Sequence, residues 1–145
     1  MYINANKKNI FAYTGARDHQ SEQESVVFVH GTGMDHTVWV LPARFFARHQ
    51  YNVLATDLPG HGRSEGPPPD TIEHMSDEIV AAMDGANIEK AALVGHSMGS
   101  LVTLALAARY PERTRSLALI GTAVPMAVHK SLLSSAAQND HAAID

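Results

Sequence analysis

Short apolar runs alternate along the chain with longer segments in which apolar residues recur at helical spacing. The apolar runs are rich in Val, Leu and Ala, which is typical of strands buried in a parallel sheet. They lie at 26–29, 53–56, 91–94 and 117–120. The helical patterns lie at 37–49, 72–87 and 98–110. An alternating segment at 9–14 predicts one more strand. This order of elements predicts an α/β fold with a mostly parallel sheet and flanking helices.

The pattern changes after Gly121. The sequence VPM at 124–126 predicts a turn, and residues 131–137 are compatible with a helix rich in small side chains. No strand pattern follows as far as Asp145. The run at 117–120 is therefore expected to form an unpaired edge of the sheet, which would expose apolar surface.

Composition and charge narrow the class of protein. The chain has 145 residues, of which 45% are hydrophobic and 18% are charged, as expected for one globular domain. Its net charge of −4 disfavours nucleic acid and anionic membranes as partners, because both require a basic face. The lack of cysteine excludes disulfides and thiolate chemistry and suits a reducing compartment. No apolar run reaches the roughly 18 residues of a membrane span, and no signal-peptide core is present, so we expect a cytoplasmic protein.

The strongest chemical signal is the sequence GHSMG at 95–99, which fits the pattern G-x-S-x-G. A serine on a tight turn between a strand and a helix adopts a strained backbone, and glycine on either side removes Cβ atoms that would collide. The strand at 91–94 and the helical pattern at 98–110 supply that context. Ser97 is then expected at a helix N-terminus, where amide groups favour negative charge. A chance loop is the alternative, and the flanking patterns disfavour it.

Two further loops contain glycine and follow predicted strands. The sequence HGTG at 30–33 could turn its amides toward a reacting carbonyl, although a plain glycine turn also fits these four residues. The sequence DLPGHGRS at 57–64 predicts a tight polar turn. We interpret this turn as structural, held by its glycines and an internal charge pair, with no catalytic role.

The three motifs, in this order and each at the carboxyl end of a strand, resemble the α/β-hydrolase superfamily over residues 26–121. The resemblance implies that Ser97 is the nucleophile and that the amide of Met98 is one oxyanion donor. The second donor is implied to be Thr32, with Gly33 as the less favoured substitute. The residues implied to line or border the substrate site are Gly31, Gly33, Met34, Trp39 and His96.

The family places an acid and then a histidine after its serine. The candidates that follow Ser97 in this chain are His129, His141, Glu112, Asp140 and Asp145. Glu112 lies at a helix end far from the catalytic edge of the sheet. Asp140 and His141 are adjacent, so their side chains would diverge on a helix. None of these residues is therefore expected to activate the serine.

The resemblance also implies a domain organisation. Residues 1–123 are expected to form the N-terminal part of an α/β-hydrolase core domain, truncated after about its sixth strand. Residues 124–145 are expected to begin an incomplete cap or lid. The acid and the histidine would then come from a missing C-terminal segment or from a second polypeptide.

A serine at this turn favours esterases, lactonases, thioesterases, C–C bond hydrolases and aminopeptidases over the family branches that use aspartate. We expect a hydrolase that acts on an acyl, carboxylic ester-type small molecule, with the isolated chain inactive. No cofactor is expected, and the other histidines lack the spacing of a metal site. Two alternatives remain: a truncated fragment without activity, and a non-catalytic protein that binds a ligand on the same fold.

Overall fold

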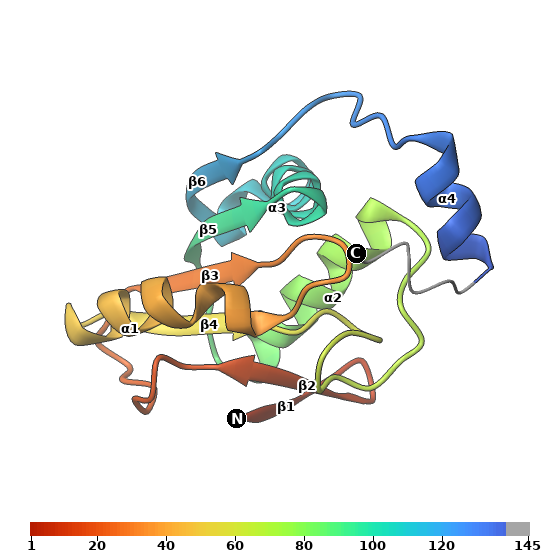
Figure 1. Ribbon diagram of the computed structural model, residues 1–145. Coiled ribbons are helices and arrows are strands. Elements are labelled where there is room, and N and C mark those ends of the chain that lie inside the picture. Colours follow the sequence, from red (N-terminus) through yellow and green to blue (C-terminus); the bar gives the residue numbers. More distant parts are fainter. Residues whose placement is uncertain (139–145) are drawn as a thin grey trace.

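The computed structural model describes residues 1–138 of the chain. Strands and helices alternate along most of it (Figure 1). The strands are β1 (Tyr2–Ala5), β2 (Lys8–Tyr13), β3 (Ser25–Val29), β4 (Asn52–Thr56), β5 (Ala91–His96) and β6 (Thr114–Ile120). The helices are η1 (His36–Trp39), α1 (Val40–Arg48), α2 (Ile72–Gly85), α3 (Met98–Arg109), η2 (Pro111–Arg113) and α4 (Lys130–Ala137).

The strands form one six-stranded sheet in the order β1-β2-β4-β3-β5-β6. The strands β4, β3, β5 and β6 are parallel to one another, and β2 pairs antiparallel with β4. The predicted α/β architecture is therefore confirmed. Because the carboxyl ends of the parallel strands meet at one edge of the sheet, the loops after β3, β4, β5 and β6 come together there.

The strand β1 was not predicted from the sequence. It pairs antiparallel with β2, and the turn between them contains Asn6 and Lys7, both with positive φ angles of 49° and 64°. Two consecutive residues of positive φ form the tight turn that suits a hairpin, and asparagine is among the residues that favour it. The asparagine at this position was the local signal available in the sequence.

Helices cover the two faces of the sheet unequally. The helices α2 and α3 lie on one face (Figure 1). Side chains such as Ile79 and Leu106 of these helices pack there against Val27 and Leu93 of the sheet. The opposite face is covered over β3 and β4 by η1 and α1, with Phe28 at the centre of that second cluster. The described helices therefore leave the second face of β5 and β6 largely open.

The open face continues to the edge of the sheet. In β6, Ser116, Ala118 and Ile120 are exposed, and within residues 1–138 this strand pairs only with β5. A groove runs between α1 and β6 and is lined mainly by apolar side chains. Its lining includes Val26, Phe46, Tyr51, Ala92, Val94, Arg115, Ser116 and Ala118.

Most predicted elements differ from the observed bounds by one or two residues, and two of the differences have a clear form. The helix predicted at 37–49 begins as the 3-10 turn η1, because the side chain of Asp35 accepts a hydrogen bond from the amide of Thr37 and caps that turn. The predicted strand at 117–120 starts earlier, at Thr114. None of the helices in residues 1–138 has the length and apolar character that crossing a bilayer requires.

Candidate active site

Ser97 occupies the single residue between β5 and α3. Its backbone has φ 53° and ψ −122°, a conformation that residues with a side chain rarely adopt. The glycines on either side permit the turn. A Cβ at Gly95 would overlap the carbonyl oxygen of Gly99, and a Cβ at Gly99 would overlap that of Val29. The tight turn therefore depends on the close approach of α3 to β3 and β5.

Hydrogen bonds hold the backbone of Ser97 in this conformation. Its amide donates to the carbonyl of Ile120 at 2.9 Å. Its own carbonyl accepts from the amide of Ser100 at 2.9 Å and from the Ser100 hydroxyl at 2.5 Å. Ser100 is fully buried, whereas Ser97 is half-buried. The backbone of Ser97 is thus held by hydrogen bonds to β6 and α3, while its side chain remains accessible.

The loop after β3 lies beside this serine. A Cβ at Gly31 would stand 3.1 Å from the Cβ of Ser97, so no larger residue fits there without a shift. The Thr32 hydroxyl donates to the sulfur of Met98 at 3.3 Å. Met98 begins α3, and the first amides of a helix have no acceptor within the helix. The structure therefore brings together Gly31, Thr32, Ser97 and Met98.

The remainder of that loop is a turn open to solvent. The amide of Met34 donates to the carbonyl of Gly31 at 3.3 Å, and Gly33 has φ 69°. Thr32 and Gly33 are exposed, and Met34 is 38% exposed. These residues form the exposed part of the loop whose first residue, Gly31, lies beside Ser97.

His96 lies between two loops at this edge of the sheet. Its Nδ1 atom is 3.2 Å from the position that a Cβ at Gly31 would take, and its Nε2 atom is 3.8 Å from that at Gly121. The ring is half-buried. His96 therefore separates the loop after β3 from the end of β6 and lies next to Ser97.

Trp39 does not lie where the sequence analysis expected it. Its ring is only 7% exposed and packs against Phe28, with 5.1 Å between ring centroids. It belongs to the core cluster beneath α1, together with Ala43 and Val53. The helical turn η1 directs this side chain into the core. Trp39 therefore packs beneath η1, next to the loop after β3, and does not border an open pocket.

His30 is a buried residue next to the site and was not among the residues implied to line it. The amide of Leu58 donates to its Nε2 atom at 3.1 Å, so its Nδ1 atom carries the proton and donates to the carbonyl of Gly31 at 2.8 Å. Burial lowers the pKa of His30 below its ordinary value. The neutral ring links the loop after β3 to the loop after β4.

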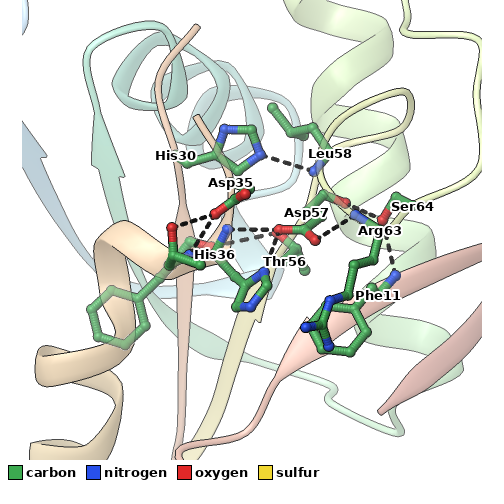
Figure 2. Close-up of polar contacts among 12 residues, drawn as sticks. Phe11, His30, Asp35, His36, Thr56, Asp57, Leu58, Arg63 and Ser64 are labelled. Atoms are coloured by element: carbon green, nitrogen blue, oxygen red, sulfur yellow. Dashed lines mark hydrogen bonds and ion pairs between the residues drawn. The ribbon is translucent and has the colours of Figure 1, made fainter. Parts of the chain in front are cut away.

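Asp57 lies at the centre of a second buried network, shown in Figure 2. Its Oδ1 atom accepts from the backbone amide of His36 at 2.6 Å and from Nδ1 of the same residue at 2.8 Å. Its Oδ2 atom accepts from the amide of Arg63 at 2.9 Å. The expected charge pair within 57–64 was wrong. The carboxylate of Asp57 is hydrogen-bonded to His36, and the guanidinium of Arg63 lies 4.9 Å above the ring of Phe11.

Asp35, His36 and Asp57 place three potential ligand atoms within 4.8 Å of one another. Hydrogen bonds already engage these atoms. Asp35 accepts from the amide and the hydroxyl of Thr37, and the carboxylate of Asp57 accepts from His36 and Arg63. The cluster is accounted for as a hydrogen-bonded network, and we assign no metal to it.

The candidate acids and histidines after Ser97 do not join this arrangement in the described residues. Glu112 lies in η2, past the far end of α3, and is exposed. His129 is exposed, with its Nδ1 atom 2.7 Å from the hydroxyl of Ser131. Asp140, His141 and Asp145 lie outside the described residues.

The sequence of this chain is similar to those of known proteins. The sequence profile described as the alpha/beta hydrolase fold matches residues 24–144. The chain is 32% identical over 102 residues to (E)-2-((N-methylformamido)methylene)succinate hydrolase of Acinetobacter baylyi, covering 70% of this chain and 38% of that protein. It is 38% identical over 105 residues to 2-hydroxymuconate semialdehyde hydrolase of a Pseudomonas species, covering 68% and 36%.

A solved structure is similar over a larger part of the chain. The enol-lactonase from Burkholderia xenovorans superposes with a TM-score of 0.71 at 29% identity, covering 81% of this chain and 45% of the enzyme. The chain thus spans less than half the length of each of these three proteins.

Proposed function

This chain belongs to the alpha/beta hydrolase fold family, and we propose that it is the nucleophile-bearing part of a serine hydrolase for small acyl, carboxylic ester-type substrates. One observation carries the proposal. Ser97 stands on a strained turn at the start of α3, directly beside Gly31 of the loop after β3. A hydroxyl in that position can reach a carbonyl carbon whose oxygen points at backbone amides from both segments.

The reaction follows from this geometry. The Oγ atom of Ser97 attacks the acyl carbon, and the carbonyl oxygen becomes an oxyanion. The amides of Met98 and Thr32 donate to that oxyanion, and one such donor contributes about 3 kcal/mol of transition-state stabilisation. Attack also requires a base that removes the proton of the hydroxyl, because a neutral serine is a weak nucleophile.

We propose that the acid and the histidine come from a segment outside these 145 residues, either a continuation of the chain or a second polypeptide. Two observations support this. The described residues bring neither Glu112 nor His129 to Ser97. The exposed edge of β6 and the groove beside it offer unpaired backbone and apolar surface on the side of the sheet where further strands would pair.

The names of the similar proteins support a small-molecule acyl substrate. Two are described as hydrolases and one as an enol-lactonase. The exposed residues Thr32 and Met34 would form part of the substrate surface, next to His96. Residues 124–138, with α4, would begin the cap over that surface.

Labelling with a fluorophosphonate tests the proposal. The chain is isolated from cells together with any segment that completes it, treated with the probe and digested for mass spectrometry. We expect one adduct, on Ser97, that disappears in Ser97→Ala. Ser131→Ala is the matched control, since Ser131 is an exposed serine outside the turn, and it should leave the adduct unchanged. An adduct on other residues only, or none, would contradict the proposal.

A further inference from the structure

We propose that Asp57 is a positioning residue of the active site, which acts by holding the loop 31–35 against Ser97. The inference rests on the proposed function, because it concerns the loop that would supply the second oxyanion donor. One end of that loop is hydrogen-bonded to Leu58 through His30, and the other end is hydrogen-bonded to Asp57 through His36. Asp57 and Leu58 are adjacent residues that directly follow β4.

The first end of the loop is held through His30. The amide of Leu58 donates to Nε2 of His30, and the opposite ring nitrogen donates to the carbonyl of Gly31. Both bonds lie in the protein interior, since His30 has no exposed surface. Gly31 is therefore fixed relative to the end of β4 as well as to its own strand.

The second end is held through His36. One carboxylate oxygen of Asp57 accepts from both the backbone amide and the ring of this residue, at 2.6 and 2.8 Å. Two bonds to a single residue define both the position of its backbone and the rotation of its side chain. Hydrogen bonds to a charged acceptor are stronger than those between neutral groups, and Asp57 is fully buried.

Asp57 is itself held by several segments, so it can serve as a fixed point. Its Oδ2 atom accepts from the amide of Arg63, and its backbone carbonyl accepts from the hydroxyl of Ser64 at 2.6 Å (Figure 2). The same hydroxyl accepts from the amide of Phe11 in β2 at 2.9 Å. A side chain at Gly62 would overlap the carboxylate, so the turn 57–64 closes tightly around it.

Between its two anchored ends the loop makes few contacts, of which the hydrogen bond from the Thr32 hydroxyl to the Met98 sulfur is one. Thr32 and Gly33 are exposed, and a Cβ at Gly33 would meet no atom within 4 Å. The position of the Thr32 amide therefore depends mainly on where the ends of the loop are held. Since Asp57 holds one end and its neighbour Leu58 holds the other through His30, loss of the carboxylate should loosen the loop before it affects α3.

Hydrogen exchange of backbone amides, measured by mass spectrometry on the whole chain, separates positioning from general stability. In Asp57→Asn, we expect the peptide covering 31–38 to exchange about tenfold faster, while peptides from α3 (98–109) keep their rates. Asp84→Asn is the matched control, because Asp84 pairs with Arg113 at the surface and lies outside this network. This variant should leave the exchange rates of both peptides unchanged.

A second variant covers the case in which Asp57→Asn does not fold. His36→Phe keeps a ring against Phe11, whose centroid lies 4.8 Å from that of His36. It removes both ring nitrogens, and with them the Nδ1 bond to Asp57, and keeps the backbone amide that also donates to Asp57. It should increase exchange in 31–38 in the same direction but by less. Equal acceleration in 31–38 and α3, or no change in 31–38 in either variant, would overturn the inference.

The rate of fluorophosphonate labelling links the loop to the chemistry. Each chain is isolated together with the segment that completes it, and we expect both network variants to label Ser97 several-fold more slowly than the unmodified chain. Faster exchange in 31–38 with an unchanged labelling rate would show that the loop does not serve the serine, and would overturn the inference while leaving the proposed nucleophile intact. No labelling of the unmodified chain together with its completing segment would instead contradict the proposed function, and the exchange data would still decide whether Asp57 holds the loop.

Discussion

The backbone amide of Ser97 donates to the carbonyl of Ile120 at 2.9 Å, so the last residue of β6 helps to hold a strained serine at the start of α3. Ile120 is itself 46% exposed at the edge of the sheet. The backbone conformation of Ser97 therefore depends on an edge strand, which pairs with one other strand among the described residues. A segment that paired with β6 would stabilise this turn as well as the sheet.

The strain at Ser97 predicts a gain in stability on substitution by glycine. Residues with a side chain rarely adopt φ 53° with ψ −122°, and strain of this kind costs about 1–3 kcal/mol. Ser97→Gly should therefore raise the free energy of unfolding, measured by urea denaturation, by about 1 kcal/mol. Ser97→Ala keeps a Cβ and serves as the control, with little change expected. A loss of stability in Ser97→Gly would contradict the strained backbone.

The isolated chain should hydrolyse esters no faster than its own Ser97→Ala variant. No described acid or histidine after Ser97 approaches the turn, and an unactivated hydroxyl is a weak nucleophile. The release of p-nitrophenol from p-nitrophenyl acetate provides the measurement. A rate clearly above that of Ser97→Ala would mean that a base exists within the chain, and His141 would then be the first residue to substitute.

The buried His30 predicts a loss of stability at acidic pH. Burial lowers the pKa of its ring in the folded chain below the ordinary value of 6.5, so the unfolded chain binds the proton more readily. The contribution of the neutral ring is complete above about pH 6.5 and decreases as the pH falls toward the lowered pKa. Urea denaturation between pH 7.5 and 5.5 should show a steeper loss for the unmodified chain than for His30→Gln. Parallel curves would contradict this assignment.

The open face of β6 predicts self-association of the isolated chain. Apolar surface beside an unpaired strand favours contact between copies, and a buried charge would oppose it. Sedimentation velocity should show large species for the unmodified chain and a larger monomer fraction for Ala118→Lys, which places an ammonium group in the groove. Leu133→Lys on α4 is the control, since Leu133 is 56% exposed and lies outside the groove. Equal association in both variants would rule out this face as the contact.

Local patterns in the sequence were sufficient to predict the strands β3, β4 and β5 and the turn at Ser97. Each depends on neighbours along the chain: a run of apolar residues predicts a buried strand, and glycines two residues from a serine indicate a turn that tolerates no Cβ. The hairpin of β1 and β2 was missed because β1 is short and the alternation of its residues is weak. Its turn residues, Asn6 and Lys7, contained the available signal.

Contacts between segments that are far apart along the chain could not be predicted from local patterns. Asp57 was expected to pair with a charge in its own turn, but its partner is His36, which lies 21 residues earlier. Trp39 was expected at the pocket, but the helical turn directs it against Phe28 in the core. In both cases the sequence shows a side chain capable of several contacts, and only the packing of separate segments selects one.

The order of strands and helices, and the position of a serine on a glycine-flanked turn, follow from the amino-acid pattern alone, because backbone sterics act over a few neighbouring residues. That the loops after β3 and β4 are joined through His30 and Asp57 became clear only from the folded chain. Those contacts form between segments that the parallel sheet brings to one edge, and a hydrogen bond depends on distance in space, which separation along the chain does not specify.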